Sequence, residues 1–174
     1  MIHLNADAEN ELDIKTLIVS IGDIARVTAE MKMEQACSLS GRVLGDIALE
    51  AAGQKREPLA IKALSIVGSL ALEFTEKGLD VAARGVVESL GTCGKTFSRQ
   101  NMETLTSLSE IYLMQLSLKS LEKKSHGAGI AAIGFLGEIG VTSVEQAIET
   151  SALEAAVILE DQKSTRLNSS HRSG

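Results

Sequence analysis

A short phrase, in which a glycine stands between an apolar and a small or polar residue, returns along this chain at a fixed interval. Leu90-Gly91-Thr92-Cys93-Gly94 is one copy. The anchor residues of the six copies are spaced 23 residues apart, and they are Gly22, Gly45, Gly68, Gly91, Met114 and Gly137. A period of this size without insertions indicates a repeat array, in which one supersecondary unit is stacked many times.

Each repeat unit has the pattern of one α-helix. The apolar residues of the fourth unit recur at helical spacing, and they are Val81, Ala82, Val86, Leu90, Cys93 and Phe97. Gly78 and Asn101 share a repeat position, and both residue types tolerate the left-handed conformation that follows a helix C-terminus. Pro58 follows Glu57 and can occupy the first position of a helix, where the missing N–H of proline costs least. A unit is therefore expected to be a helix of about 20 residues and a short turn.

The pattern predicts an all-α fold of about seven helices. They are expected near residues 10–31, 35–54, 58–77, 81–99, 103–124, 127–146 and 150–161. Short turns force neighbouring helices to run antiparallel, so that two units of 46 residues form a helix pair, as in HEAT and armadillo solenoids. A closed bundle is the alternative, but a strict repeat favours an open stack. The recurrent glycines are expected where helices cross closely, because a missing Cβ lets two backbones approach.

The repeats also resemble a known family. The phrase Ser89-Leu90-Gly91, together with Glu76-Lys77-Gly78-Leu79-Asp80, is similar to repeats of HEAT-like α-solenoid proteins, among them uncharacterised archaeal ones. The resemblance covers residues about 10–161. It implies a surface that holds other macromolecules, and it supplies no reaction.

The C-terminal residues break the repeat pattern. Residues 163–171 resemble the translation of a widely used sequencing adapter, and a natural serine-rich tail is the alternative. We therefore predict a HEAT-like domain over residues 1–161 and a non-native or disordered tail over 162–174, with the natural C-terminus missing. Without the three bases of the tail, 14 basic residues stand against 23 acidic ones, which gives a net charge of −9.

Charge and composition restrict the partners. An acidic body repels nucleic acid and anionic membranes, and one Tyr, three Phe and no Trp leave little material for base stacking. The sequence starts with no signal peptide, and the uncharged stretch from Gly127 to Gly137 is too short to span a bilayer. We therefore predict a cytoplasmic protein with no nucleic acid partner and no direct membrane insertion.

Candidate reactive residues are few. His3 and His126 lack the neighbouring glutamates of HEAT-like di-iron enzymes, and Gly127-Ala128-Gly129 lacks the lysine and preceding strand of a phosphate loop. Cys37 and Cys93 fall in slots that other repeats fill with small or apolar residues, so both are expected to be buried. We predict no catalytic, cofactor-binding or metal-binding residue and no cofactor.

Two groups of charged residues either face the solvent or bind a partner. The carboxylates Asp23, Asp46 and Glu138 share one repeat slot, and they form either a solvated row or an ion site. The bases Lys119, Lys123 and Lys124 end the fifth predicted helix, where they suit the helix dipole or dock an acidic partner.

The sequence as a whole favours a non-catalytic scaffold or adaptor that binds another protein. A regulatory or oligomerising segment of a larger, possibly membrane-attached protein is the alternative, and a HEAT-like lyase or hydroxylase is the least favoured function. The apolar residues of the last repeats lack a following repeat, which predicts self-association through an exposed C-terminal repeat.

Overall fold

The computed structural model describes the backbone of residues 3–123 and 125–170, and side chains between residues 10 and 149 except 124 and 148. This part of the chain holds six α-helices and no strand. The helices are α1 (His3–Glu30), α2 (Glu34–Gly53), α3 (Glu57–Glu76), α4 (Asp80–Arg99), α5 (Glu103–Lys123) and α6 (His126–Ser170). The all-α fold is confirmed, with six helices in place of about seven, and α2 to α5 each take up one 23-residue unit.

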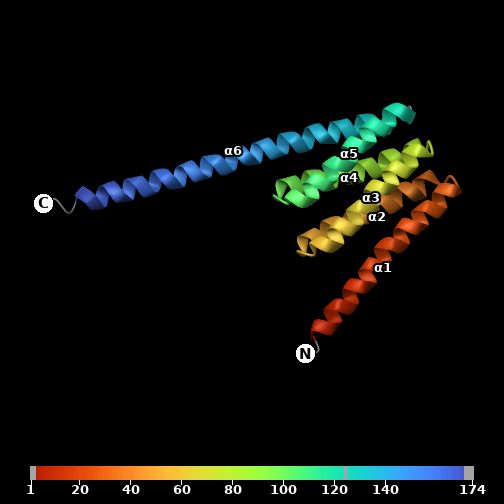
Figure 1. The fold of residues 1–174 in the computed structure, drawn as a ribbon, viewed down its shortest axis with the longest axis horizontal. Helices are drawn as coiled ribbons and strands as arrows, with labels where there is room; N and C mark the ends of the chain where they lie inside the picture. Colours follow the sequence, from red (N-terminus) through yellow and green to blue (C-terminus); the bar gives the residue numbers. More distant parts are fainter. Residues whose placement is uncertain (1–2, 124, 171–174) are drawn as a thin grey trace.

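The helices stack in two layers. Each helix packs on the next one and on the next but one, so that α1, α3 and α5 form one layer and α2, α4 and α6 the other. Figure 1 shows α1 and α6 on opposite sides of the stack. The molecule is therefore an open α-solenoid built of antiparallel helix pairs, and the alternative of a closed bundle is wrong.

The repeated glycines mark close crossings inside each layer. A Cβ built on Gly68 would lie 2.3 Å from Cγ of Tyr112, and one built on Gly91 would lie 2.1 Å from Cγ of Phe135. Gly22 and Gly45 likewise meet Ile66 and Ser89, two helices further along. These four contacts confirm that glycine lets the helix backbones approach.

Gly137 is an exception to this expectation. A Cβ built on it would meet nothing within 4 Å. The predicted contact is wrong at this repeat because the described part of the chain has no helix two places beyond α6. The glycine slot of α6 is therefore an empty hollow at the end of the stack.

The turns between helices repeat one backbone geometry. Lys32, Lys55, Gly78 and Asn101 occupy the same repeat position and have φ values of 56°, 59°, 69° and 55°. At the α3–α4 turn, the N–H of Leu79 donates to the carbonyl of Phe74 at 2.9 Å. The N–H of Gly78 donates to the backbone carbonyl of Thr75 at 3.2 Å. This is the Schellman pattern, so the predicted left-handed cap is confirmed, and it extends to the two lysines.

We expect glycine to be favoured over lysine in this cap. Lys55→Gly should raise the free energy of unfolding by about 0.5–1 kcal/mol, because a left-handed backbone is strained for a residue with a Cβ. Gly78→Ala, at the equivalent turn, should lower it by a similar amount. Urea titrations of both variants test this, and equal shifts in the same direction would contradict it.

The C-terminal part differs from the expected pair of helices at 127–146 and 150–161. A single helix, α6, continues to Ser170 and projects past the other helices (Figure 1). Ala147 occupies the repeat position of the left-handed cap, and alanine has the highest helix propensity of all residues. Nothing at that position stops the helix, so the predicted turn does not form.

The proposed boundary at residue 161 stays a prediction. The backbone of α6 runs through residues 161 and 162, whereas the side chains of residues 150–174 lie outside the described part. The adapter origin of residues 163–171 is likewise a prediction that concerns residues without described side chains.

Candidate interaction surface

Of the residues considered for a reactive site, His126 and Gly127-Ala128-Gly129 lie together at the start of α6. His126 is the exposed first residue of α6, and the side chain of His3 lies outside the described residues. Gly127-Ala128-Gly129 forms the first turn of α6, where Ala128 is buried and Gly129 packs against Ser120. Among the described residues, no group of three or more His, Cys, Asp and Glu side chains could hold a metal ion.

The three carboxylates of the shared repeat slot do not gather. Asp23 lies on α1 in one layer and binds Arg26 at 3.2 Å, whereas Asp46 and Glu138 lie in the other layer on α2 and α6. Thr92 of α4 occupies the slot between them, and Glu138 forms an ion pair with Lys95 at 2.6 Å. The arrangement fits a solvated row and does not form an ion site.

The predicted basic spot at the end of α5 is partly neutralised. Lys119 pairs with Glu76 of α3 at 3.2 Å. Lys123 is exposed in the last turn of α5, and Lys124 lies outside the described residues. The local positive charge is therefore smaller than the sequence suggests.

Both cysteines are buried, as predicted. The thiol of Cys37 lies 3.3 Å from the hydroxyl of Thr28 and donates to the carbonyl of Ala25 at 3.6 Å. The thiol of Cys93 donates to the carbonyl of Gly45 at 3.5 Å, which joins α4 to α2. Burial, with a smaller contribution from the charge of Asp46, raises the pKa of Cys93 from 9.0 to about 12.

This pKa shift predicts a pH dependence of stability. The unfolded chain loses the Cys93 proton near pH 9.0, whereas the folded chain keeps it up to about pH 12. The unfolded state therefore binds fewer protons than the folded state in this interval. The contribution of the Cys93 thiol to stability is complete below pH 9.0 and should be lost as the pH rises to about 12. Urea titrations between these limits should give a steeper decline for the wild type than for Cys93→Ala. Parallel curves would contradict the assignment.

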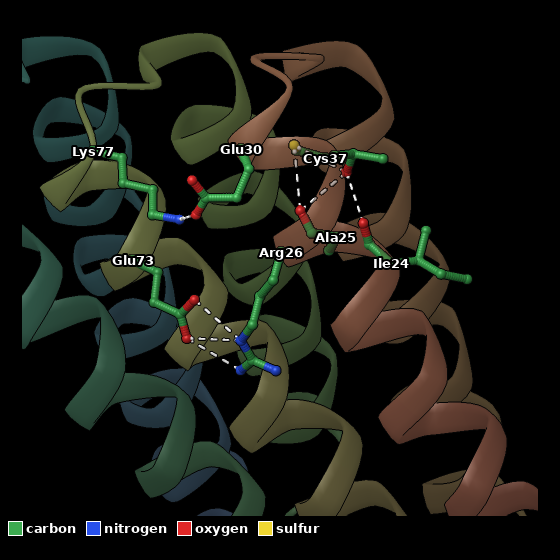
Figure 2. A network of polar contacts seen from close by, with 8 residues as sticks. Ile24, Ala25, Arg26, Glu30, Cys37, Glu73 and Lys77 are labelled. Atoms are coloured by element: carbon green, nitrogen blue, oxygen red, sulfur yellow. Dashed lines mark hydrogen bonds and ion pairs between the residues drawn. The ribbon is translucent and has the colours of Figure 1, made fainter.

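Ion pairs two helices apart fix α1 against α3. The guanidinium of Arg26 donates to the carboxylate of Glu73 through Nε and Nη2 at 3.1 Å, and Lys77 pairs with Glu30 one turn further on (Figure 2). The hydrogen bonds to Glu73 raise the pKa of Arg26. These pairs were not predicted from the sequence, although their 47-residue separation, close to two repeat units, is a usable signal. They join α1 to α3, two helices further along.

An apolar groove lies between α1 and α2 at the N-terminal end of the stack. We name it the N-terminal groove. It has a volume of about 440 Å³, and its lining comprises Ile14, Leu17, Val43, Asp46, Ile47, Glu50, Ala51, Gln54, Arg56 and Leu59. Its lining combines apolar side chains with charged ones, so it has the composition of a site for another helix.

The opposite end of the stack is apolar as well. We name it the C-terminal face. Its exposed apolar side chains come from α5 and α6, and they are Ile111, Met114, Leu118, Leu121, Ile130, Ile133, Val141 and Val144. In the described part of the chain, no further helix covers this face of α6. The groove at the N-terminal end was not predicted from the sequence.

Two helices in the described part are long and apolar enough to cross a membrane. They are Glu57–Glu76, which is α3, and the segment His126–Ala147 of α6. More than half of the α3 window is buried inside the stack, as in the core helix of many proteins. The predicted cytoplasmic location and the predicted lack of membrane insertion therefore stay predictions.

Fold and surfaces together define the class of this protein: an open α-solenoid with an apolar groove at one end and an apolar face at the other. The chain matches no protein-family model, no curated protein and no solved structure at a significant level. The class therefore rests on the repeat and the structure.

Proposed function

We propose that the chain is a non-catalytic scaffold that binds a helix of another protein in the N-terminal groove. One observation carries this proposal. Leu17 and Val43 stand partly exposed in the lining of a groove of about 440 Å³ between two antiparallel helices. An amphipathic helix buries its apolar face in grooves of this kind, using side chains spaced three, four and seven residues apart.

The lining also provides orientation. Asp46, Glu50 and Arg56 lie around the apolar residues, so a bound helix would find both acidic and basic partners. The ion pairs of Arg26 with Glu73 and of Lys77 with Glu30 join α1, which forms one wall of the groove, to α3.

A selection of helical peptides tests the proposal. Peptides selected against the wild type should carry helical apolar spacing and should bind Leu17→Lys at least tenfold more weakly. Val81→Lys is the matched control, because Val81 is an exposed apolar residue of the central helix α4. Peptides that bind the wild type and Leu17→Lys equally would overturn the proposal.

The alternative is an oligomerising or regulatory segment of a larger protein. The exposed C-terminal face favours it, since such a face is covered by a further repeat in solenoids. We also propose that the chain is related to HEAT-like proteins, including the archaeal ones. The repeat and the two-layer stack support this relationship. A lyase or hydroxylase function is the least favoured.

A further inference from the structure

We infer that the helix received by the N-terminal groove is α6 of a second copy of this chain, so that copies stack head to tail. This inference rests on the proposed function, because it names the partner of the same groove. Inside one chain, every helix packs on the next and the next but one. In the proposed assembly, α6 of one copy packs on α1 of a second copy as on the next helix, and on α2 of that copy as on the next but one.

At the N-terminal end, exposed residues occupy slots that are buried elsewhere in the stack. Ile24 is 56% exposed, whereas its counterparts one and two helix pairs further in, Leu70 and Leu116, are fully buried. Leu17 is 52% exposed, and its counterparts Ala63 and Ser109 are fully buried. A preceding helix pair covers these slots in α3 and α5, so the same type of unit is what fits over α1.

The C-terminal face shows the same mismatch. Ile133 is 57% exposed, whereas its counterpart Val87 on α4 is fully buried. Val144 is 59% exposed, and its counterparts Ser98 and Ala52 are 5% and 3% exposed. In the layer of α2, α4 and α6, the two ends of the stack are thus the two halves of an interface that occurs within the chain, whereas in the other layer Met114 of α5 occupies the slot that Gly22 and Gly68 hold.

The glycine crossings provide a matching pair of shapes. Within the layer of α2, α4 and α6, Ser89 packs on Gly45 and Phe135 packs on Gly91. The corresponding side chain of α2 is Val43, which is exposed in the N-terminal groove, and the corresponding glycine of α6 is Gly137, whose hollow is empty. In the head-to-tail stack, Val43 of one copy fills the hollow at Gly137 of the next.

The end face of the described chain is left open by the course of α6. Residues 147–170 continue α6 as one helix and do not return across α5. A second copy, by contrast, brings two helices that already have the repeat spacing. The interface joins two different surfaces, so the assembly grows as a filament or closes as a ring.

Blocking one end at a time tests this arrangement. Ile24→Lys blocks the N-terminal end and Ile133→Lys the C-terminal face. Val81→Lys is the control, because Val81 is 61% exposed on α4, against 56% and 57% for the other two. Circular dichroism verifies that each exposed substitution leaves the helices intact, and sedimentation velocity measures the mass.

We expect the mass of the wild type and of Val81→Lys to rise with concentration to at least twice the 18.4 kDa of one chain. Each end-blocked variant alone should stay monomeric. An equimolar mixture of the two should stop at the dimer, since it has one intact end of each kind.

The inference would be overturned by a wild type that stays monomeric, which is expected if its own C-terminal segment folds back over the C-terminal face. It would also be overturned by an end-blocked variant that still assembles, or by a mixture of the two variants that remains monomeric. A monomeric wild type that still binds the selected peptides at the N-terminal groove would leave the proposed function standing. A wild type that neither assembles nor binds helical peptides at the N-terminal groove would overturn both the inference and the proposed function.

Discussion

Gly91→Ala is expected to lower the free energy of unfolding by about 1–3 kcal/mol. The new Cβ would lie 2.1 Å from Cγ of Phe135, which is the root of the ring and cannot swing aside like the end of a flexible side chain. Alanine favours the helix by about 1 kcal/mol over glycine, but the overlap between α4 and α6 is expected to exceed that gain.

Gly137→Ala is the matched control, and the opposite sign is expected. Gly137 occupies the same repeat slot on α6, where a Cβ meets nothing within 4 Å. The helix propensity then acts alone, so stability should rise by about 0.5–1 kcal/mol. Urea titrations at low protein concentration, where copies are separate, measure both. A gain of similar size in both variants would show that the crossing at Phe135 is not close.

Phe97→Ala is expected to have the largest effect, a loss of about 3–5 kcal/mol. Phe97 is fully buried on α4, which packs on α2, α3, α5 and α6. A cavity there therefore weakens the core around α4. The loss is a large part of the roughly 5–15 kcal/mol that stabilise a typical domain.

The effect of Phe97→Ala is measured by urea titration and by amide hydrogen exchange. Exchange should accelerate in α4 and in the four helices that pack on it. Leu118→Ala is the control, since Leu118 is exposed on α5, and its effect should stay within about 0.5 kcal/mol. Equal losses for the two variants would contradict the described core.

The sequence by itself determined the repeat and the boundaries of the inner helices. The predicted helices near 35–54, 58–77, 81–99 and 103–124 agree within one residue with α2 to α5. The signals are local: apolar spacing fixes the helix, a residue that tolerates positive φ ends it, and Glu57-Pro58 starts the next. The buried positions of Cys37 and Cys93 follow from the same period.

Only the tertiary structure decided which surfaces are free. Asp23, Asp46 and Glu138 share a slot in the sequence, yet the alternation of layers separates Asp23 from the other two. The pairing of Arg26 with Glu73, the open hollow at Gly137 and the N-terminal groove depend on what lies one or two helices away. A periodic sequence describes every unit alike, whereas exposure depends on the neighbours of each unit, and the units at the ends of a stack lack neighbours on one side.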